Sequence, residues 1–556
     1  MNMYEMLGNK HNGQRKKFIL LGSLMSLLIV LIVTISVSTV HPKSSVHIST
    51  VSKATATTTA PFPCKDTLYP KACESQILSA KDASSTPITL DDVLNLSIKS
   101  VIDRATLAKS LAQNVSLMNQ RENPNSFTAL DDCVELLDHS IDQLNSILDS
   151  KTTTPSPDDT QTWLSTAITH QTTCLDGLQT HKFFKEKELI HATLQSNIQH
   201  VSNSLVIHKS IVSAKTLKVS TAGRRLLSDD FPTWVSTGER KLLESSIKDI
   251  EVNAVVAMDG TGTHRTISEA LAFASLVGGG GRTVIHVTAG TYNENNIMVS
   301  AKQSNVMLVG DGKGITIITG SKSAGGGSTT RRSASFGAGG DGFIARDISF
   351  VNTAGPSKGQ AVALVVTADK SVFYRCSIIG YQDTLYTLSN RQFYRETDIY
   401  GTVDFIFGNS AVVFQSCNIL PRSRGSDGKV FITAQGRTDP NQNTGISIHK
   451  CRIAGTGGNT YLGRPWKKYS RTVYMQSFLD GINPAGWFPW NGMSTIYYGE
   501  YMNSGPGAST SGRVKWSGNH PSMTPAEASE FTVGSLISGN SWLPSTGIIF
   551  ESGLGA

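Results

Sequence analysis

The sequence predicts a multi-domain protein in which an all-α region of the four-helix-bundle type precedes an all-β region built as a parallel β-helix. Three observations predict this order. Apolar residues recur at helical three-and-four spacing between residues 61 and 215. After about residue 250, short β-rich runs are interrupted by many of the chain's 50 glycines. In that second region a motif returns about every 20 residues, as in a solenoid.

The first 60 residues are predicted to lie outside both domains. Residues 1–17 form an N-terminal tail that ends in basic residues, and an uncharged apolar run follows at 18–40. That run is long enough to cross a bilayer, and the preceding positive charges favour a cytosolic N-terminus. Residues 18–40 are therefore a signal peptide or a transmembrane signal anchor. Both direct the chain into the secretory pathway, with Ser/Thr-rich residues 41–60 as a linker.

The helical region, residues 61–215, has features that suit this route. Four of the chain's seven cysteines lie in it, which favours a bundle crosslinked by disulfides. They are Cys64, Cys73, Cys133 and Cys174. Asn95 and Asn114 each begin an Asn-x-Ser triplet, the acceptor sequence for N-glycosylation.

Residues 216–243 lose the helical periodicity and are predicted to be a processing linker. Two basic pairs, Arg224-Arg225 and Arg240-Lys241, are each followed by Leu-Leu. Two such pairs between regions of different fold type indicate cleavage by a protease of the secretory pathway.

The region from residue 244 to 556 carries the solenoid signal. Cys376-Ser377-Ile378, Thr397-Asp398-Ile399 and Cys417-Asn418-Ile419 follow one another at intervals of 21 and 20 residues. In a parallel β-helix each coil stacks on the last at the strand spacing of about 4.8 Å. Equivalent residues of successive coils therefore share one face.

One set of polar residues follows a similar interval. Gln360, Gln382 and Asp404 are 22 residues apart, and Asp383 adjoins Gln382. We expect the first three to form a column with Asp383 beside it. Two neighbouring carboxyl groups should have their pKa values pushed apart, so that one is ionised while the other keeps its proton. That pair suits a nucleophile with a general acid.

Charge and histidine content restrict the chemistry. From Glu244 onward, 26 Lys and Arg face 21 Asp and Glu, a net of +5, which suits an anionic polymer as partner. The secretory leader argues against nucleic acid. No stretch has zinc-ligand spacing, so we expect neither metal nor cofactor. The four histidines after residue 250 are scattered: His264, His286, His449 and His520.

Several motifs from about residue 250 onward resemble the plant pectin methylesterases. They are GTYNEN, GQAVAL, YQDTLY, GTVDFIFGN, TAQGRTDPNQNTGI, YLGRPWKKYSRTVYMQS and NPAGWFPW, in that order. The helical region resembles the inhibitor domain that precedes the enzyme in many such precursors. The resemblance implies a right-handed β-helix, and it implies that Cys64 pairs with Cys73 and Cys133 with Cys174.

The resemblance also implies roles in hydrolysing methyl esters of cell-wall homogalacturonan. Asp404 would attack the ester carbonyl, and Asp383 would protonate methanol and then activate water. Gln382 would donate to the oxyanion with help from Gln360, and Arg464 would orient Asp404. Two further residues, Thr330 and Trp466, would contact substrate. We expect a monomeric mature enzyme in the cell wall, with the helical region acting as autoinhibitor or export control.

One position departs from the family pattern. Many relatives carry a cysteine where Thr397 stands, paired with the residue at Cys417. Its absence predicts lower stability with activity retained, and it leaves open how Cys376, Cys417 and Cys451 pair.

Three alternative functions remain. Gly355-Pro356-Ser357-Lys358-Gly359 matches the G-x-S-x-G pattern of serine esterases, although Pro356 and the β-like run after it deny the helix that this mechanism needs. Two carboxylates on adjacent coils also suit a pectin-acting glycosidase or lyase. In the third alternative, the helical region binds other esterases while the β region is inert.

Overall fold

The computed structural model describes residues 63–82, 89–119, 124–149, 155–179, 185–220, 250–277, 281–294, 296–425, 428–455 and 459–555. Residues 62–556 form one compact unit. The predicted tail, apolar run and linker of residues 1–60 lie outside the described residues, as do both basic pairs of the predicted processing linker. Among the described helices, none is long and apolar enough to span a membrane.

The N-terminal region is helical, as predicted. Its elements are η1 (Pro63–Asp66), α2 (Pro70–Asp82), α3 (Leu90–Asn119), α4 (Pro124–Leu148), α5 (Pro157–Gln179) and α6 (Lys185–Ser220). Proline opens α2, α4 and α5, where its missing N–H costs nothing and its fixed φ suits a first helical position. Before α3, the Thr89 hydroxyl and the Asp92 carboxylate each accept a backbone N–H of the other residue. Helix α6 continues to Ser220, five residues beyond the expected end of the helical region at 215.

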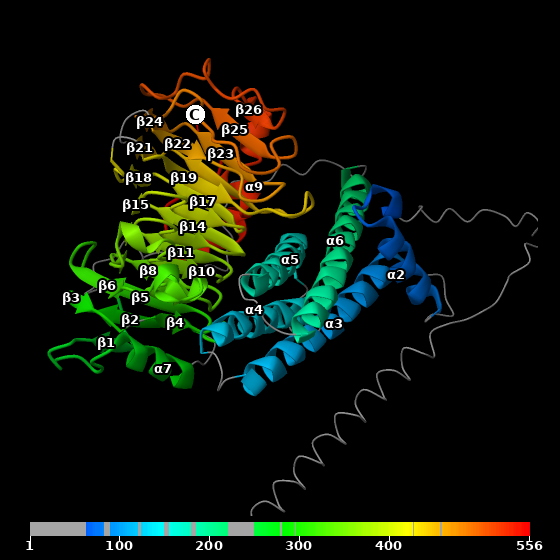
Figure 1. The fold of residues 1–556 in the computed structure, drawn as a ribbon, viewed down its shortest axis with the longest axis horizontal. Helices are drawn as coiled ribbons and strands as arrows, with labels where there is room; N and C mark the ends of the chain where they lie inside the picture. Colours follow the sequence, from blue (N-terminus) through cyan, green and yellow to red (C-terminus); the bar gives the residue numbers. More distant parts are fainter. Residues whose placement is uncertain are drawn as a thin grey trace, which may run out of the picture. The chain divides into compact units, whose positions relative to one another are not determined.

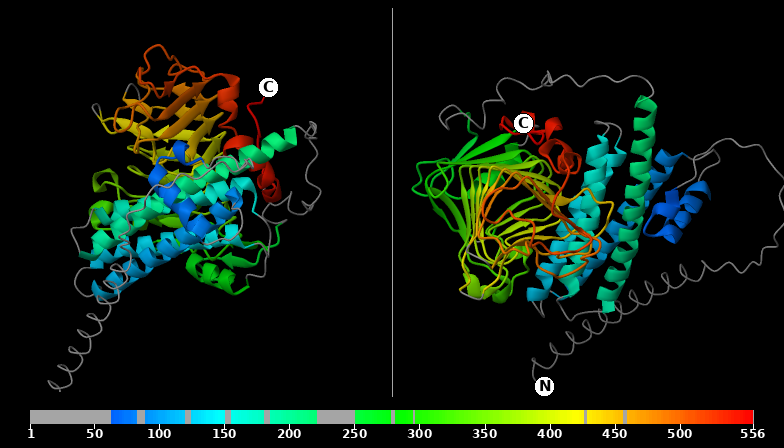
Figure 2. Two further views of the ribbon diagram at one scale, coloured as in Figure 1. Left: turned by 90° about the vertical axis from the view of Figure 1, so that its right-hand side faces the viewer. Right: turned by 90° about the horizontal axis from the view of Figure 1, so that it is seen from above.

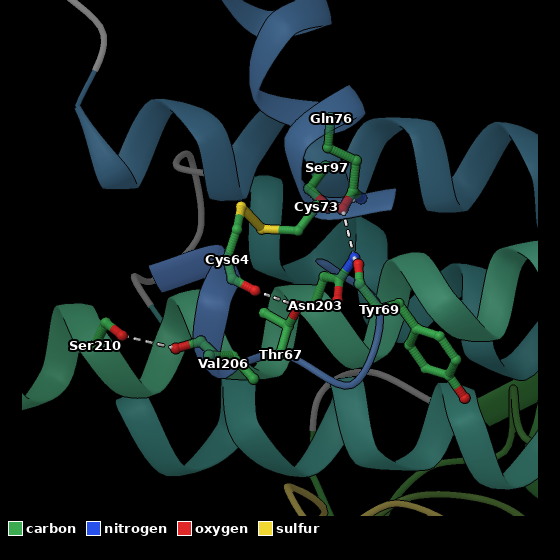
Figure 3. The surroundings of a disulfide bond; sticks show 9 residues. All are labelled: Cys64, Thr67, Tyr69, Cys73, Gln76, Ser97, Asn203, Val206 and Ser210. Atoms are coloured by element: carbon green, nitrogen blue, oxygen red, sulfur yellow. Dashed lines mark hydrogen bonds between the residues drawn. A yellow bond between two sulfur atoms is a disulfide. The ribbon is translucent and has the colours of Figure 1, made fainter. Parts of the chain in front are cut away.

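Helices α3 to α6 pack as a four-helix bundle in which α3 contacts α4 and α6, and α5 contacts the same two helices. Both expected disulfides are present, Cys64–Cys73 and Cys133–Cys174. The first closes the turn between η1 and α2 (Figure 3). Beside it the Asn203 amide of α6 donates to the backbone oxygen of Tyr69 at 3.3 Å, which ties this turn to the bundle.

The C-terminal region is a parallel β-helix of three sheets, as predicted. The first sheet has the order β1 (Ala254–Val256), β2 (Thr283–Val287), β5 (Val306–Gly310), β8 (Ile344–Arg346), β11 (Ser371–Tyr374), β14 (Arg391–Arg395), β17 (Ala411–Gln415), β20 (Gly445–His449), β23 (Arg471–Met475), β25 (Tyr497–Tyr501) and β26 (Asn519–His520). The second has β3 (Gly290–Tyr292), β6 (Thr316–Gly320), β9 (Ser349–Asn352), β12 (Ser377–Ile379), β15 (Asp398–Gly401), β18 (Asn418–Pro421), β21 (Arg452–Ala454) and β24 (Phe478–Asp480). The third has β4 (Ile297–Val299), β7 (Phe336–Ala338), β10 (Leu364–Val366), β13 (Leu385–Thr387), β16 (Ile406–Gly408), β19 (Val430–Gln435) and β22 (Thr460–Gly463).

Equivalent residues stack from coil to coil, and this fills the core. Ile378 pairs with Ile399, and Ile399 with Ile419, which places the isoleucines of the sequence repeat in one internal column. The rings of Phe373, Tyr394 and Phe414 form a second column, with centroid separations of 4.8 and 4.7 Å. Figure 1 shows the strands of successive coils lying side by side in chain order, and Figure 2 shows the same stacking from two further directions.

The open end and one outer face of the solenoid are covered. Helix α7 (Ile267–Val277) buries its apolar side against the first coils, which shields an end that would otherwise expose the core. Residues from α8 (Pro525–Ser529) and α9 (Val533–Leu536) form a separate apolar cluster on the outside of the first sheet. The third sheet keeps an outer face that carries the site described next.

Candidate active site

A groove of about 810 Å³ runs over the third sheet and gathers the polar residues singled out in the sequence. All seven expected catalytic and substrate-contacting residues line it: Thr330, Gln360, Gln382, Asp383, Asp404, Arg464 and Trp466. None of the four histidines after residue 250 lines it. The described residues hold no group of three or more metal-ligating side chains arranged to bind an ion.

The stacking interval in this part of the solenoid is 21 residues, and this corrects the expected column. Leu364 pairs with Leu385, and Leu385 with Ile406. Asp383 and Asp404 each stand two residues before these strands, so it is these two that stack in register. The 22-residue interval moves one position along the strand at each coil. Gln360, Gln382 and Asp404 therefore share the groove but follow a diagonal across it.

Both aspartates lie where the backbone bends into the third sheet. Asp383 has φ 59° and Asp404 has φ 50°, in the left-handed region that few non-glycine residues adopt. The Asp383 N–H donates to the backbone oxygen of Val403 on the next coil at 3.0 Å, which holds this bend in place. The same conformation recurs at turns of other coils, for example at Arg375, Glu396 and Ser416, so it belongs to the solenoid backbone and is not special to the groove. Two successive coils thus present a carboxyl group at the same edge of the groove.

Asp404 has a cationic partner. The Arg464 guanidinium donates to both carboxylate oxygens, Nε to Oδ1 at 2.8 Å and Nη2 to Oδ2 at 2.7 Å. Arg464 is in turn held between the rings of Phe431 and Trp490, at 4.3 and 4.2 Å from their centroids. Burial raises the pKa of Asp404, and the bidentate contact with Arg464 opposes that rise.

Asp383 has no such partner. It is 8% exposed, and no hydrogen bond to its carboxyl group occurs among the described residues. Burial, and next the negative charge of Asp404, raise the pKa of Asp383 well above its usual value. The two carboxyl groups therefore differ in the direction expected of a proton donor beside an ionised nucleophile.

The two glutamines are half-buried, and their side-chain amides make no hydrogen bond within the described part of the chain. Their backbones are fixed, since Gln360 O accepts from Ala324 N at 2.8 Å and Gln382 O accepts from Ala361 N at 3.2 Å. Positioned amides with free N–H groups at the edge of two carboxyl groups are suited to receive a developing oxyanion.

Aromatic side chains form the floor of the groove. Tyr386 stacks on Phe407 with ring centroids 4.2 Å apart, and Trp466 stands edge-on to Phe407 at 6.1 Å. Gly436 makes room for Trp466, because a Cβ there would lie 2.8 Å from the indole ring. Flat apolar faces beside polar groups suit the faces of sugar rings.

The helical region contributes to the rim, which the sequence patterns did not predict. Ala129, Asp132, Thr173, Asp176 and Gly177 line the groove. One feature of the sequence could have indicated that these two aspartates lie together: Asp132 adjoins Cys133, and Asp176 lies two residues after Cys174. The expected disulfide between these cysteines brings the two aspartates together. Trp490 and Arg331 also line the groove and were missed, since neither follows the coil interval.

Ser357 does not form a nucleophile elbow. It lies in the three-residue helix η6 (Pro356–Lys358), and Gly359 and an extended segment follow instead of a longer helix. Ser357 is exposed and does not line the groove. The serine-esterase alternative therefore lacks the local geometry that it requires.

Comparison with known proteins gives consistent results for both regions. Residues 253–540 match the pectinesterase family model, and residues 63–207 match the model described as plant invertase/pectin methylesterase inhibitor. "Probable pectinesterase/pectinesterase inhibitor 35" of Arabidopsis thaliana is 56% identical over 465 residues, 82% of this chain and 87% of that protein. "Pectinesterase 2" of Citrus sinensis is 48% identical over 509 residues, 88% of this chain and 94% of that protein. The solved pectin methylesterase from carrot is 54% identical and aligns with a TM-score of 0.53, covering 56% of this chain and 99% of its own.

Proposed function

Because the chain belongs to the pectinesterase family and joins a pectinesterase region to an inhibitor-like helical region, we propose that it de-esterifies pectin through an Asp404 nucleophile and an Asp383 acid and base. The substrate is the methyl ester of homogalacturonan in the cell wall, and the products are pectate and methanol. One observation carries the proposal: two carboxyl groups in register on adjacent coils, of which only Asp404 contacts a cation.

The proposed reaction has two halves. Asp404 attacks the ester carbonyl carbon, the C–O bond to the methoxy group breaks, and protonated Asp383 gives its proton to the departing methanol. Asp383, now ionised, takes a proton from water, which attacks the acyl-enzyme and frees Asp404. Gln382 and Gln360 donate to the oxyanion in both halves, and Trp466 and Thr330 contact the sugar chain.

The same groove supports an autoinhibitory role for the helical region. Asp132 and Asp176 occupy its rim, and Lys467 beside Trp466 pairs with Asp176 at 2.8 Å. In the part of the chain that the structure describes, the apolar cores of the two regions are separate except at Leu136, so each is expected to fold alone after separation. Cleavage at Arg224-Arg225 or Arg240-Lys241 in the secretory pathway would then release the wall enzyme. Asn95 and Asn114 are exposed on α3 and thus accessible to glycosylation.

Measuring products directly tests the proposal against the glycosidase and lyase alternatives. The cleaved protein should release methanol from methyl-esterified homogalacturonan without new reducing ends or unsaturated ends. Asp404→Ala should abolish methanol release while its circular dichroism spectrum stays that of the wild type. Turnover by this variant at the wild-type rate would refute the assignment of the nucleophile. Full activity of the uncleaved chain would refute the autoinhibitory role.

A further inference from the structure

Three cations in or next to the groove have acidic partners only in the helical region: Arg331 lines the groove, Arg332 follows Arg331 in the chain, and Lys467 follows the groove residue Trp466. Arg331 Nη1 lies 2.6 Å from Asp132 Oδ1 and 2.8 Å from Glu135 Oε2. Arg332 Nε lies 2.8 Å from Asp132 Oδ1, and its Nη2 also contacts Glu135. Lys467 pairs with Asp176. Among the described residues, the β-helix supplies no carboxylate to any of the three.

Some cations of the β-helix are paired within it, whereas Lys302 and Lys370 are paired with Asp138 and Asp159 of the helical region. Arg464 binds Asp404, and two more pairs show the same pattern. They are Arg375 with Asp347 and Arg513 with Glu500. Arg331, Arg332 and Lys467 are distinguished by their place: when the helical region leaves, they lose every acidic partner described, and they lie in or next to the groove that holds Asp383 and Asp404.

Arg331 also has unused donor capacity. The residue is 8% exposed, and its Nε atom is buried without a hydrogen-bond partner in the described chain. A guanidinium offers five donors in a fork that matches a carboxylate. Asp132 and Glu135 use only part of this fork, so the site can accept an acid in another orientation.

The placement of these cations fits a polymer lying across the coils. Arg331 and Arg332 belong to η5 (Arg331–Ser333), just before β7. Strand β7 lies two strands from β13, which follows Asp383, a distance of roughly 10 Å at about 4.8 Å per strand. Lys467 lies on another side, next to Trp466 and the residues that follow β13 and β16. The cations thus flank the reacting carboxyl pair rather than contact it.

We propose that Arg331 with Arg332, and Lys467, bind free carboxylates of galacturonate units that flank the reacting ester, and that Asp132, Glu135 and Asp176 occupy these positions in the precursor. The proposal rests on the proposed function. De-esterified units carry a carboxylate where esterified units carry a neutral methyl ester, so these three residues set a preference for partly de-esterified chains. The carboxylates of Asp132, Glu135 and Asp176 thereby stand where the carboxylates of the de-esterified product would bind.

The test compares two polymers with the cleaved protein: fully methyl-esterified homogalacturonan and a randomly half-esterified form. For the double variant Arg331→Gln/Arg332→Gln, the ratio of kcat/KM on the half-esterified polymer to that on the fully esterified polymer should fall roughly fivefold. Lys467→Gln should lower the ratio less. The matched control Lys515→Gln removes an exposed positive charge away from the groove and should leave the ratio unchanged.

A second measurement does not depend on turnover preference. A fully de-esterified galacturonate oligomer should inhibit the cleaved wild type competitively, and the double variant should require roughly fivefold more of it. The charge-preserving variant Arg331→Lys/Arg332→Lys should keep most of the preference for the half-esterified polymer and most of the affinity for the oligomer. This result would show that the losses in the Gln variant come from the missing charge and not from misfolding.

Two outcomes would overturn the proposal: equal losses on both polymers, or an unchanged inhibition constant in the double variant. Absence of methanol from either polymer with the wild type would instead refute the proposed function itself.

Discussion

At the scale of single residues, the pKa of Asp404 depends on its contact with Arg464. In the proposed mechanism Asp404 must be ionised to attack, so activity should be lost as the pH falls through its pKa. Arg464 opposes the rise in that pKa caused by burial. Arg464→Gln should therefore raise the pKa of Asp404 further and move the acidic limb of the kcat/KM profile to higher pH. Methanol release measured across a pH series checks this.

The alkaline limb of the kcat/KM profile depends on the other carboxyl group, that of Asp383. In the proposed mechanism Asp383 must hold its proton in the first half-reaction, so activity should fall as the pH rises through its raised pKa. The two limbs belong to the interacting pair rather than to one residue each. An acidic limb at the same pH in the wild type and in Arg464→Gln would contradict the role given to this arginine.

The role of Gln382 can be tested separately, because its side-chain amide makes no hydrogen bond among the described residues that a substitution would remove. Gln382→Ala should lower kcat by about 10²- to 10³-fold, the usual effect of removing one oxyanion donor. The thermal midpoint should change little, since no described hydrogen bond of this side chain stabilises the fold. Gln382→Glu, which keeps the size but removes the N–H donors, is the matched control and should be similarly impaired. A loss confined to KM would place Gln382 in ground-state binding instead.

The residues of the site were predictable to different degrees. Asp383 and Asp404 follow the coil interval, so a sequence repeat suffices to bring them together. Arg331 and Trp490 lie outside the repeat, in segments whose position the coil interval does not determine. Asp132 and Asp176 are helical surface residues, and periodicity within a helix carries no information about which other region that surface will contact.

At the scale of the structural element, Thr397 occupies the position where the family pattern predicts a cysteine. Its hydroxyl lies 3.3 Å from Phe373 O, 3.1 Å from Arg395 O, and 3.4 Å from the N–H of Cys376. Thr397 is fully buried, so these contacts satisfy its hydroxyl inside the coil. The expected loss of stability relative to crosslinked relatives stays a prediction.

Thr397→Val removes the hydroxyl while keeping the shape. Since it leaves a buried N–H and two carbonyl groups with fewer partners, it should lower the free energy of unfolding by about 1–3 kcal/mol. Urea denaturation of the cleaved protein measures this. Thr402→Val offers a comparison, because no hydrogen bond of that buried hydroxyl is among those described. Equal effects of the two substitutions would mean that the Thr397 hydrogen bonds contribute nothing specific.

The elements themselves were the most predictable feature. Three-and-four spacing depends on neighbours within one helix, and the recurring isoleucines depend on neighbours in adjacent coils. The exact register was less accessible: the interval of 22 read from Gln360, Gln382 and Asp404 differs from the true 21 by one residue. Only strand pairing, such as Leu385 with Ile406, shows whether residues on successive coils stand in register or are displaced by one position at each coil.

At the scale of the whole molecule, Leu136 is, among the described residues of the helical region, the one that belongs to an apolar cluster of the β-helix. It is 1% exposed and packs with groove residues that include Tyr386 and Phe407. Most other contacts of this interface are polar, such as the pairing of Asp132 with Arg331. Polar contacts exchange with water at little net gain, whereas burial of a leucine is lost outright on separation.

Leu136→Ala should therefore weaken the hold of the helical region by about 2–5 kcal/mol and raise methanol release by the uncleaved chain. The variant carries its own control. Once the linker is cut and the helical region removed, residue 136 is absent, so the β-helix must then match the wild type in kcat and KM. Asp142→Ala, an exposed position on the same helix, should leave the uncleaved chain as inactive as the wild type. If Leu136→Ala remains equally inactive, the polar and ionic contacts alone maintain inhibition, and the carboxylates at Arg331, Arg332 and Lys467 must supply most of the binding energy.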